Sequence, residues 1–176
     1  MRNLSLEPAT EPTIPVVSFV GHSGSGKTML LEKLIRELKR RSYRVAAIKH
    51  HHRRDLQFDR AGKDSWRFAR AGADQIVIAG PDRVIYVRSF EEEPTLKEVV
   101  AVIRDVDLIL IEGFKRADVP KIEVSRGQPE SDLISSPDEL VAIVADRRFD
   151  ADVPQFDLED VAGLADLIEA RFLTQV

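Results

Sequence analysis

The segment from Val16 to Leu38 limits the fold of this chain more than any other. Residues 16–20 form a short apolar run rich in β-branched side chains, which predicts a buried strand. The loop that follows reads Gly21-His22-Ser23-Gly24-Ser25-Gly26-Lys27-Thr28 and fits the pattern G-x-x-x-x-G-K-[ST]. From there to Leu38 the apolar residues recur at helical spacing. A strand, a glycine-rich loop and a helix in this order predict a phosphate-binding P-loop.

The residue types in this loop suit an anionic ligand. Glycines let consecutive backbone N–H groups turn inward, and the following helix adds its positive N-terminal end. We expect Lys27 to reach the β- and γ-phosphates as a candidate catalytic group, and the Thr28 hydroxyl to ligate Mg²⁺. The candidate phosphate-binding residues are His22, Ser23, Gly24, Ser25, Gly26, Lys27 and Thr28. The alternative is a Gly/Ser turn that matches by accident, but both flanks favour a nucleoside triphosphate site.

The composition narrows the class of protein. A chain of 176 residues suits one domain, which we expect at 16–176 behind a flexible tail at 1–15. The net charge of −4 argues against a general nucleic-acid or anionic-membrane binder. The chain has no cysteine and no apolar stretch of about 20 residues, so it offers neither a thiolate metal site nor a membrane span. We therefore expect a cytoplasmic protein.

Strand and helix patterns alternate along the chain. We predict strands at 44–49, 75–79, 83–88, 107–113, 121–124 and 141–145. Helices are predicted from Asp64 or Ser65 to Ala71, after a capping box at Thr95-Leu96-Lys97-Glu98, and at the end of the chain behind Asp157 as its cap. The fold class that follows is α/β, a P-loop NTPase-type, mainly parallel sheet flanked by helices, with ligands at the carboxyl ends of its strands.

An antiparallel hairpin is expected as an addition to this sheet. The runs 75–79 and 83–88 flank the turn residues Gly80-Pro81-Asp82, and both faces of the pair are apolar. Such a hairpin needs neighbouring elements that bury both of its faces, either helices of the same subunit or a partner subunit. We therefore predict a homodimer that is joined partly through this hairpin.

Two acidic residues stand where strands end. Glu112 closes a fully apolar strand, the place where P-loop proteins position a carboxylate for Mg²⁺ or the attacking water, so it is a candidate catalytic and metal-binding residue. The alternative is an acid that only caps the strand. Asp146 ends the last strand and could accept the N–H donors of guanine, although the full N-K-x-D motif is absent. Asp107 begins the Glu112 strand at the opposite sheet edge and is interpreted as structural.

The polar run from His50 to Lys63 leaves three interpretations open. His50, His51 and His52 could ligate a metal such as Zn²⁺ or Ni²⁺. The neighbouring basic residues could instead contact anionic phosphate, or the loop could simply be solvated. Asp59 lies in the same loop and is a further candidate Mg²⁺ ligand, acting through water.

Several segments together resemble a known family. These are the P-loop, Ile48-Lys49-His50, Gly62-Lys63-Asp64-Ser65, Ala71-Gly72-Ala73, Ile111-Glu112-Gly113-Phe114-Lys115 and Lys121-Ile122-Glu123-Val124. Their order resembles the molybdopterin-guanine dinucleotide biosynthesis protein B (MobB) family over nearly the whole chain. Arg53, Arg54 and Ala61 depart from the family pattern.

The resemblance implies a GTP-binding accessory protein with weak, Mg²⁺-dependent GTPase activity. It would be a homodimer that assists the guanylyltransferase of molybdenum-cofactor synthesis, with molybdopterin as a further partner. It places phosphates at residues 24–28 and the cation near Thr28 and Glu112, and it favours guanine at Asp146. Two alternatives remain: a small-molecule kinase, whose lid would be the loop 126–136, and a metal-delivery GTPase that uses His50–His52.

Overall fold

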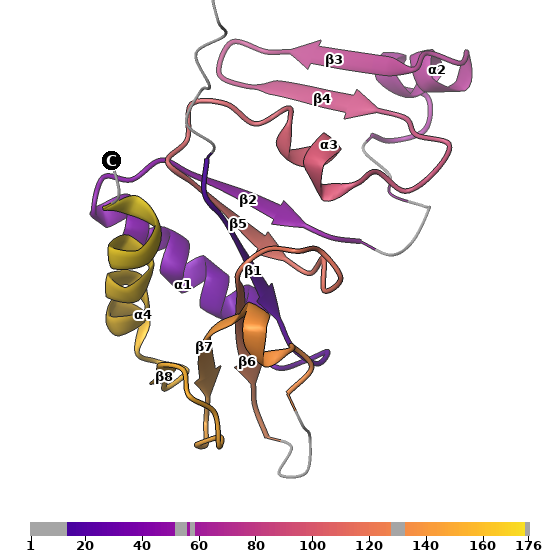
Figure 1. The fold of residues 1–176 in the computed structure, drawn as a ribbon. Coiled ribbons are helices and arrows are strands. Elements are labelled where there is room, and N and C mark those ends of the chain that lie inside the picture. The colour runs from indigo at the N-terminus through magenta and orange to yellow at the C-terminus, as the bar shows by residue number, and fades with distance from the viewer. Residues whose placement is uncertain (1–13, 52–55, 57–58, 128–132, 175–176) are drawn as a thin grey trace, which may run out of the picture. The chain divides into compact units, whose positions relative to one another are not determined.

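The computed structural model describes residues 14–51, 56, 59–127 and 133–174 (Figure 1). The chain comprises two compact units, one of Met1–His50 with Ile103–Val176 and one of His51–Val102. The sequence analysis treats 16–176 as one domain, and both units include residues of that range. Of the predicted tail, only Ile14 and Pro15 are described, and the Pro15 carbonyl accepts a hydrogen bond of 2.9 Å from the Ile109 N–H.

The first unit is built on a six-stranded sheet in the order β2-β5-β1-β6-β7-β8, with every pair of neighbours parallel. The strands are β1 (Val16–Val20), β2 (Val45–Lys49), β5 (Leu108–Glu112), β6 (Lys121–Ser125), β7 (Leu140–Ala145) and β8 (Gln155–Phe156). The parallel α/β sheet predicted from the sequence is thereby confirmed. Its carboxyl edge collects the residues that follow each strand.

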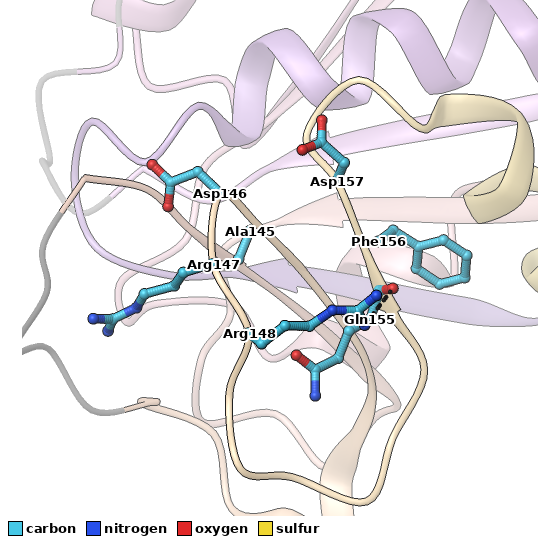
Figure 2. Close-up of a pocket in the computed structure, with 7 residues that line it drawn as sticks. All are labelled: Ala145, Asp146, Arg147, Arg148, Gln155, Phe156 and Asp157. Carbon is cyan, nitrogen blue, oxygen red and sulfur yellow. Dashed lines mark hydrogen bonds between the residues drawn. The ribbon is translucent and has the colours of Figure 1, made fainter.

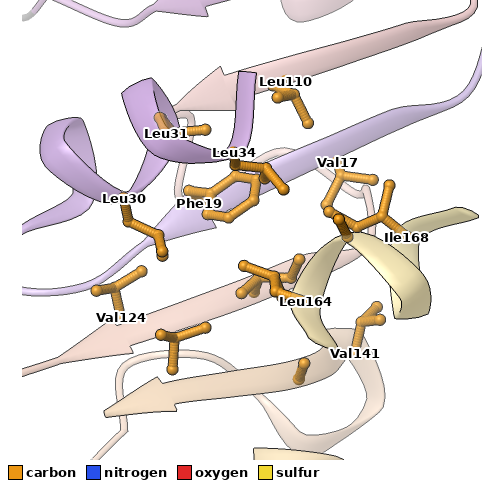
Figure 3. Packing of buried hydrophobic residues seen from close by; sticks show 14 of the residues in the cluster. Val17, Phe19, Leu30, Leu31, Leu34, Leu110, Val124, Val141, Leu164 and Ile168 are labelled. Carbon is orange, nitrogen blue, oxygen red and sulfur yellow. The ribbon is translucent and has the colours of Figure 1, made fainter. Parts of the chain in front are cut away.

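Helices α1 (Lys27–Arg40) and α4 (Val161–Ile168) pack side by side on one face of this sheet (Figure 1). Alternate strand residues, such as Phe19 and Val124, meet the apolar stripe of α1, where Leu34 is fully buried (Figure 3). A π-helical turn, η2 (Glu169–Leu173), continues α4. The core therefore holds the strand that leads into the P-loop and the helix that leaves it.

The opposite face of β6 carries two buried charged side chains. The Lys121 ammonium lies 2.5 Å from the carboxylate of Glu139, the last residue of the short 3₁₀ turn η1 (Pro137–Glu139). The Glu123 carboxylate accepts hydrogen bonds from the backbone N–H groups of Ile134 and Ser135, at 2.8 and 2.9 Å. These bonds satisfy both charges and attach the segment before β7 to the sheet.

The start of α4 corrects one sequence prediction. Asp157 was expected to cap the last helix, but the cap is Asp160, whose carboxylate accepts from the Gly163 N–H at 3.0 Å. Asp157 instead accepts from the Glu159 N–H at 2.9 Å, in a turn before the helix. Both acids precede the same apolar period, so the pattern alone could not separate them.

The second unit contains α2 (Asp64–Arg70), the antiparallel hairpin β3 (Gln75–Ala79) and β4 (Val84–Arg88), and α3 (Leu96–Val100). The hairpin and the capping box of Thr95 and Glu98 are confirmed. On one hairpin face Ile76 is buried; on the other, Val77, Val84 and Tyr86 are 61, 64 and 42% exposed. Within the described parts of the chain, no helix is long and apolar enough to cross a membrane.

Candidate functional site

The P-loop leaves β1 through glycines in conformations that side chains rarely adopt. Gly21 has φ +143°, and a Cβ there would lie 2.2 Å from the Val124 carbonyl oxygen, so the loop can pass β6 only with glycine. Gly24 and Gly26 have φ of +79° and +93°, with open space around each Cβ position. These two glycines are therefore required for the turn of the backbone rather than for packing.

The N-terminus of α1 faces this loop without a side-chain cap. Gly26 occupies the N-cap position, and it makes no side-chain cap hydrogen bond to the backbone N–H groups of the first turn of α1. Uncapped N–H groups at a helix start are a ready site for an anion, because the helix dipole adds a partial positive charge there. The local structure thus agrees with the predicted role of residues 22–28.

Lys27 lies across the loop. Its ammonium donates to the carbonyls of Gly21 and His22, at 3.2 and 2.6 Å, and to Ser25 Oγ at 3.3 Å. Burial is the largest cause that lowers the pKa of Lys27; Glu112 opposes this effect, and the positive charges of Lys115 and Lys49 reinforce it. The ammonium is therefore held among loop carbonyls, at the place where a phosphate would compensate its charge.

Glu112 and Thr28 come together as the sequence predicted. The Thr28 hydroxyl donates to Glu112 Oε2 at 2.8 Å, and the Lys49 ammonium donates to Glu112 Oε1 at 2.6 Å. The sheet register explains the meeting, because Glu112 pairs with Phe19 of β1 and with Lys49 of β2 at the carboxyl edge. Burial alone would raise the pKa of Glu112, but the bonds from Lys49 and Thr28 bring it below its usual value. The carboxylate is therefore ionised beside the P-loop.

The turn after Glu112 is held by His50. The His50 and Phe114 rings stack with centroids 4.1 Å apart, and the Phe114 N–H donates to His50 Nδ1 at 3.4 Å. The Ser18 hydroxyl donates to the Gly113 carbonyl at 2.5 Å. A Cβ on Gly113, at φ +108°, would lie 2.7 Å from the His50 Cβ. His50 therefore packs against the Glu112 turn, an arrangement that no sequence pattern indicated.

We expect Gly113→Ala to lower the free energy of unfolding by about 2 kcal/mol more than the matched control Gly72→Ala. Gly72 has a similar φ, +95°, but no atom within 4 Å of its Cβ position, so the excess reports the collision with His50. Urea denaturation of both variants measures the difference. Equal losses for the two variants would contradict the tight contact at Gly113.

The other polar candidates of the 50–63 loop are placed only in part. His52 lies outside the described residues, and the described ones contain no group of three or more His, Asp or Glu that could hold a metal ion. The three-histidine interpretation therefore stays a prediction. Asp59, in the second unit, accepts hydrogen bonds from Ser65 Oγ and the Arg60 N–H, which lower the pKa of its carboxyl group. Its role as a metal ligand also stays a prediction.

A cavity of about 190 Å³ lies between the P-loop and the end of β6. His22–Ser25 line one side, and Ser125, Arg126 and Gly127 line the other. The sequence analysis named Arg126 and Gly127 only within the lid loop of the kinase alternative, and it did not include Ser125–Gly127 among the phosphate-binding residues. They could have been found from position alone, because β6 is the neighbour of β1 and its carboxyl end must lie next to the P-loop.

Asp146 follows β7 at the same edge of the sheet. Its Oδ2 accepts a hydrogen bond of 2.9 Å from the Gly127 N–H, so it touches a residue of the P-loop cavity. It also lines a second cavity, of about 240 Å³, together with Phe156 and Asp157 (Figure 2). The first unit therefore presents a glycine-rich loop, a hydroxyl–carboxylate pair and two neighbouring cavities along one edge.

Comparison with known proteins gives consistent matches. A family model described as "Molybdopterin guanine dinucleotide synthesis protein B" matches residues 16–146. A protein of Haemophilus influenzae, named molybdopterin-guanine dinucleotide biosynthesis adapter protein, is 37% identical over 159 residues, 89% of this chain and 88% of the relative. A protein of the same name from Escherichia coli is 37% identical over 168 residues, 91% and 94% of the two chains. The crystal structure of Bacillus subtilis MobB superposes with a TM-score of 0.72 at 25% identity, covering 92% of this chain and 99% of that one.

Proposed function

The chain belongs to the molybdopterin guanine dinucleotide synthesis protein B family, and from this membership we propose that it is a GTP-binding adapter with slow Mg²⁺-dependent GTPase activity. The observation that carries the proposal is the contact between the Thr28 hydroxyl and the Glu112 carboxylate, 2.8 Å apart beside the P-loop. Hydroxyl and carboxylate oxygens are hard ligands of the kind that Mg²⁺ takes, along with substrate phosphates and water. The donor set therefore fits that ion.

Each residue of the site has a part in binding. The uncapped N–H groups at the start of α1 hold the phosphates, and Lys27 exchanges its carbonyl partners for phosphate oxygens. Thr28 and Glu112 hold the cation, and Lys49 keeps the Glu112 carboxylate ionised and oriented. Mg²⁺, when bound, would neutralise charge on the β- and γ-phosphates. The Glu112 carboxylate would also orient a water for attack.

Guanine is the proposed base because of Asp146. An ionised carboxylate accepts hydrogen bonds only, which matches the N1–H and 2-amino donors of guanine. Asp146 follows β7, at the carboxyl edge where α/β sheets bind their ligands. The proposed partners of the adapter are the guanylyltransferase of molybdenum-cofactor synthesis and molybdopterin, consistent with the names of the relatives.

Isothermal titration calorimetry of the full chain tests the proposal. With Mg²⁺ present, GTP is expected to bind more tightly than ATP, and phosphate release is expected to be slow. The titration is then repeated with molybdopterin and with the guanylyltransferase. Failure of the protein to bind either nucleotide would overturn the proposed function.

We also propose a homodimer joined through the exposed face of the hairpin, defined by Val77, Val84 and Tyr86. Three large apolar side chains exposed on one strand pair are an unusual surface for a monomer and invite association. The sequence analysis expected two apolar faces, and the structure buries Ile76 on the other face.

The variant Val77→Glu with Tyr86→Lys tests this interface. The two residues are directly opposite in the β3–β4 register, so the new charges pair across the strands and preserve the hairpin. We expect a folded monomer, because the affinity of the dimer should fall by about 100-fold or more. Light scattering gives the mass. The control, Val102→Lys, changes another exposed valine and should leave the mass of the dimer unaltered. If the wild-type protein were a monomer at micromolar concentration, the proposed interface would be contradicted.

A further inference from the structure

The cavity at the ends of β7 and β8 has the position and the chemistry of a base site. We propose that it binds the guanine ring and that Asp157 acts there as a second base-reading carboxylate, which accepts a hydrogen bond from the 2-amino group. The proposal rests on the GTP binding proposed above. It adds a specificity residue that the sequence pattern had taken for a helix cap.

The order of the strands leads from the phosphates to this cavity. The P-loop follows β1, Ser125–Gly127 follow β6, Asp146 follows β7, and Asp157 follows β8, and these four strands are consecutive neighbours in the sheet. All run parallel, so the residues after each strand line the same edge. A nucleotide with its triphosphate on the P-loop can extend along this edge past Gly127 toward Asp146.

The two cavities meet at one hydrogen bond. Gly127 lines the P-loop cavity, Asp146 lines the 240 Å³ cavity, and the Gly127 N–H donates to the Asp146 carboxylate at 2.9 Å. The second cavity therefore lies next to the first along this edge. Phe156 and Ala145 contribute apolar surface to it, which suits the faces of an aromatic ring.

The Asp146 and Asp157 carboxylates are arranged to accept hydrogen bonds from a ligand. Asp146 uses Oδ2 for Gly127, and Asp157 uses Oδ1 for the Glu159 N–H; in the described parts of the chain neither remaining oxygen accepts a hydrogen bond. Figure 2 shows the Asp146 and Asp157 carboxylates in the upper part of the view, above the side chains of Arg147 and Arg148. Ionised carboxylates can only accept hydrogen bonds, so two of them match the adjacent N1–H and 2-amino donors of guanine. Adenine would instead place its N1 acceptor against these carboxylates.

The variant Asp157→Asn isolates this role. Asparagine keeps an Oδ1 acceptor for the Glu159 N–H, so the turn before α4 is retained, while its N–H₂ group now opposes the 2-amino group of guanine. Inosine triphosphate lacks the 2-amino group, and xanthosine triphosphate carries a carbonyl in its place. The matched control is Asp152→Asn, an exposed aspartate on the same β7–β8 connection that does not line the cavity.

Calorimetry of the full chain with Mg²⁺ and each triphosphate is the test. We expect Asp157→Asn to lose about tenfold in GTP affinity, to bind inosine triphosphate within about twofold of wild type, and to gain about tenfold for xanthosine triphosphate. Asp152→Asn should match wild type throughout. Equal losses for all three nucleotides, or no change for any, would overturn the base-reading role of Asp157 alone. If the wild-type protein bound none of them, the proposed function itself would be overturned.

Discussion

Lys27→Ala is expected to weaken the binding of Mg-GTP by about 100-fold or more, roughly 3 kcal/mol of binding free energy. The ammonium carries the positive charge among the P-loop carbonyls, and its removal leaves the phosphates with backbone donors alone. The side chain packs against the loop rather than the core under α1, so the fold should survive. Calorimetry measures the affinity, and circular dichroism checks the fold.

Lys33→Ala is the matched control for this variant. Lys33 lies on the same helix, but its ammonium pairs with Glu159 at 2.5 Å and takes no part in the P-loop. The control removes an equal charge from α1 and should leave GTP affinity within about twofold of wild type, because a partly exposed ion pair contributes little. Wild-type affinity in Lys27→Ala would remove the basis for phosphate binding at this loop.

Glu112→Gln is expected to lower the rate of Mg²⁺-dependent GTP hydrolysis by about 100-fold while GTP affinity changes by less than about threefold. Glutamine keeps the size of the side chain and an oxygen acceptor for Thr28, but it loses the negative charge that serves the cation or the attacking water. Most of the binding comes from the α1 N–H groups and Lys27, which the change leaves in place. Phosphate release under single-turnover conditions, measured beside calorimetry, separates the two effects.

Asp107→Asn supplies the comparison at the other end of the same strand. Asp107 directly precedes β5 and accepts hydrogen bonds from the Arg44 backbone and guanidinium, at 2.7 and 2.6 Å, which agrees with its structural interpretation. Loss of the Asp107 negative charge should change the free energy of unfolding without changing the rate of GTP hydrolysis. If the rate of GTP hydrolysis in Glu112→Gln equalled that of the wild type, the role of Glu112 would be structural, as an acid at the end of a strand that binds Lys49 and Thr28.

The features that the sequence predicted correctly are those with short-range signals. The P-loop, the strand that ends in Glu112, the hairpin around Gly80-Pro81-Asp82 and the Thr95 capping box each lie within one element or one turn. Their residue types are dictated by backbone conformation or by burial on both strand faces. The meeting of Thr28 with Glu112 could also be predicted, because parallel strands bring their carboxyl ends to one edge.

The features that the sequence missed depend on contacts between distant segments. Nothing near His50 in the sequence indicates that its ring stacks on Phe114, because the β2–β5 register brings the two residues together. Asp157 and Asp160 have the same chemistry and similar spacing to the last helix, and only the path of the chain after β8 decides which one caps it.

The charged side chains on the face of β6 opposite to α1 affect which substitutions this sequence can accept over evolutionary time. Lys121 is almost completely buried and has its carboxylate partner in Glu139, eighteen positions along the chain. A buried charge that loses its partner is destabilising, whereas replacing both members by apolar residues can be neutral. Substitutions at 121 and 139 should therefore be accepted in pairs, so that two positions far apart in the chain would drift together among descendants of this protein.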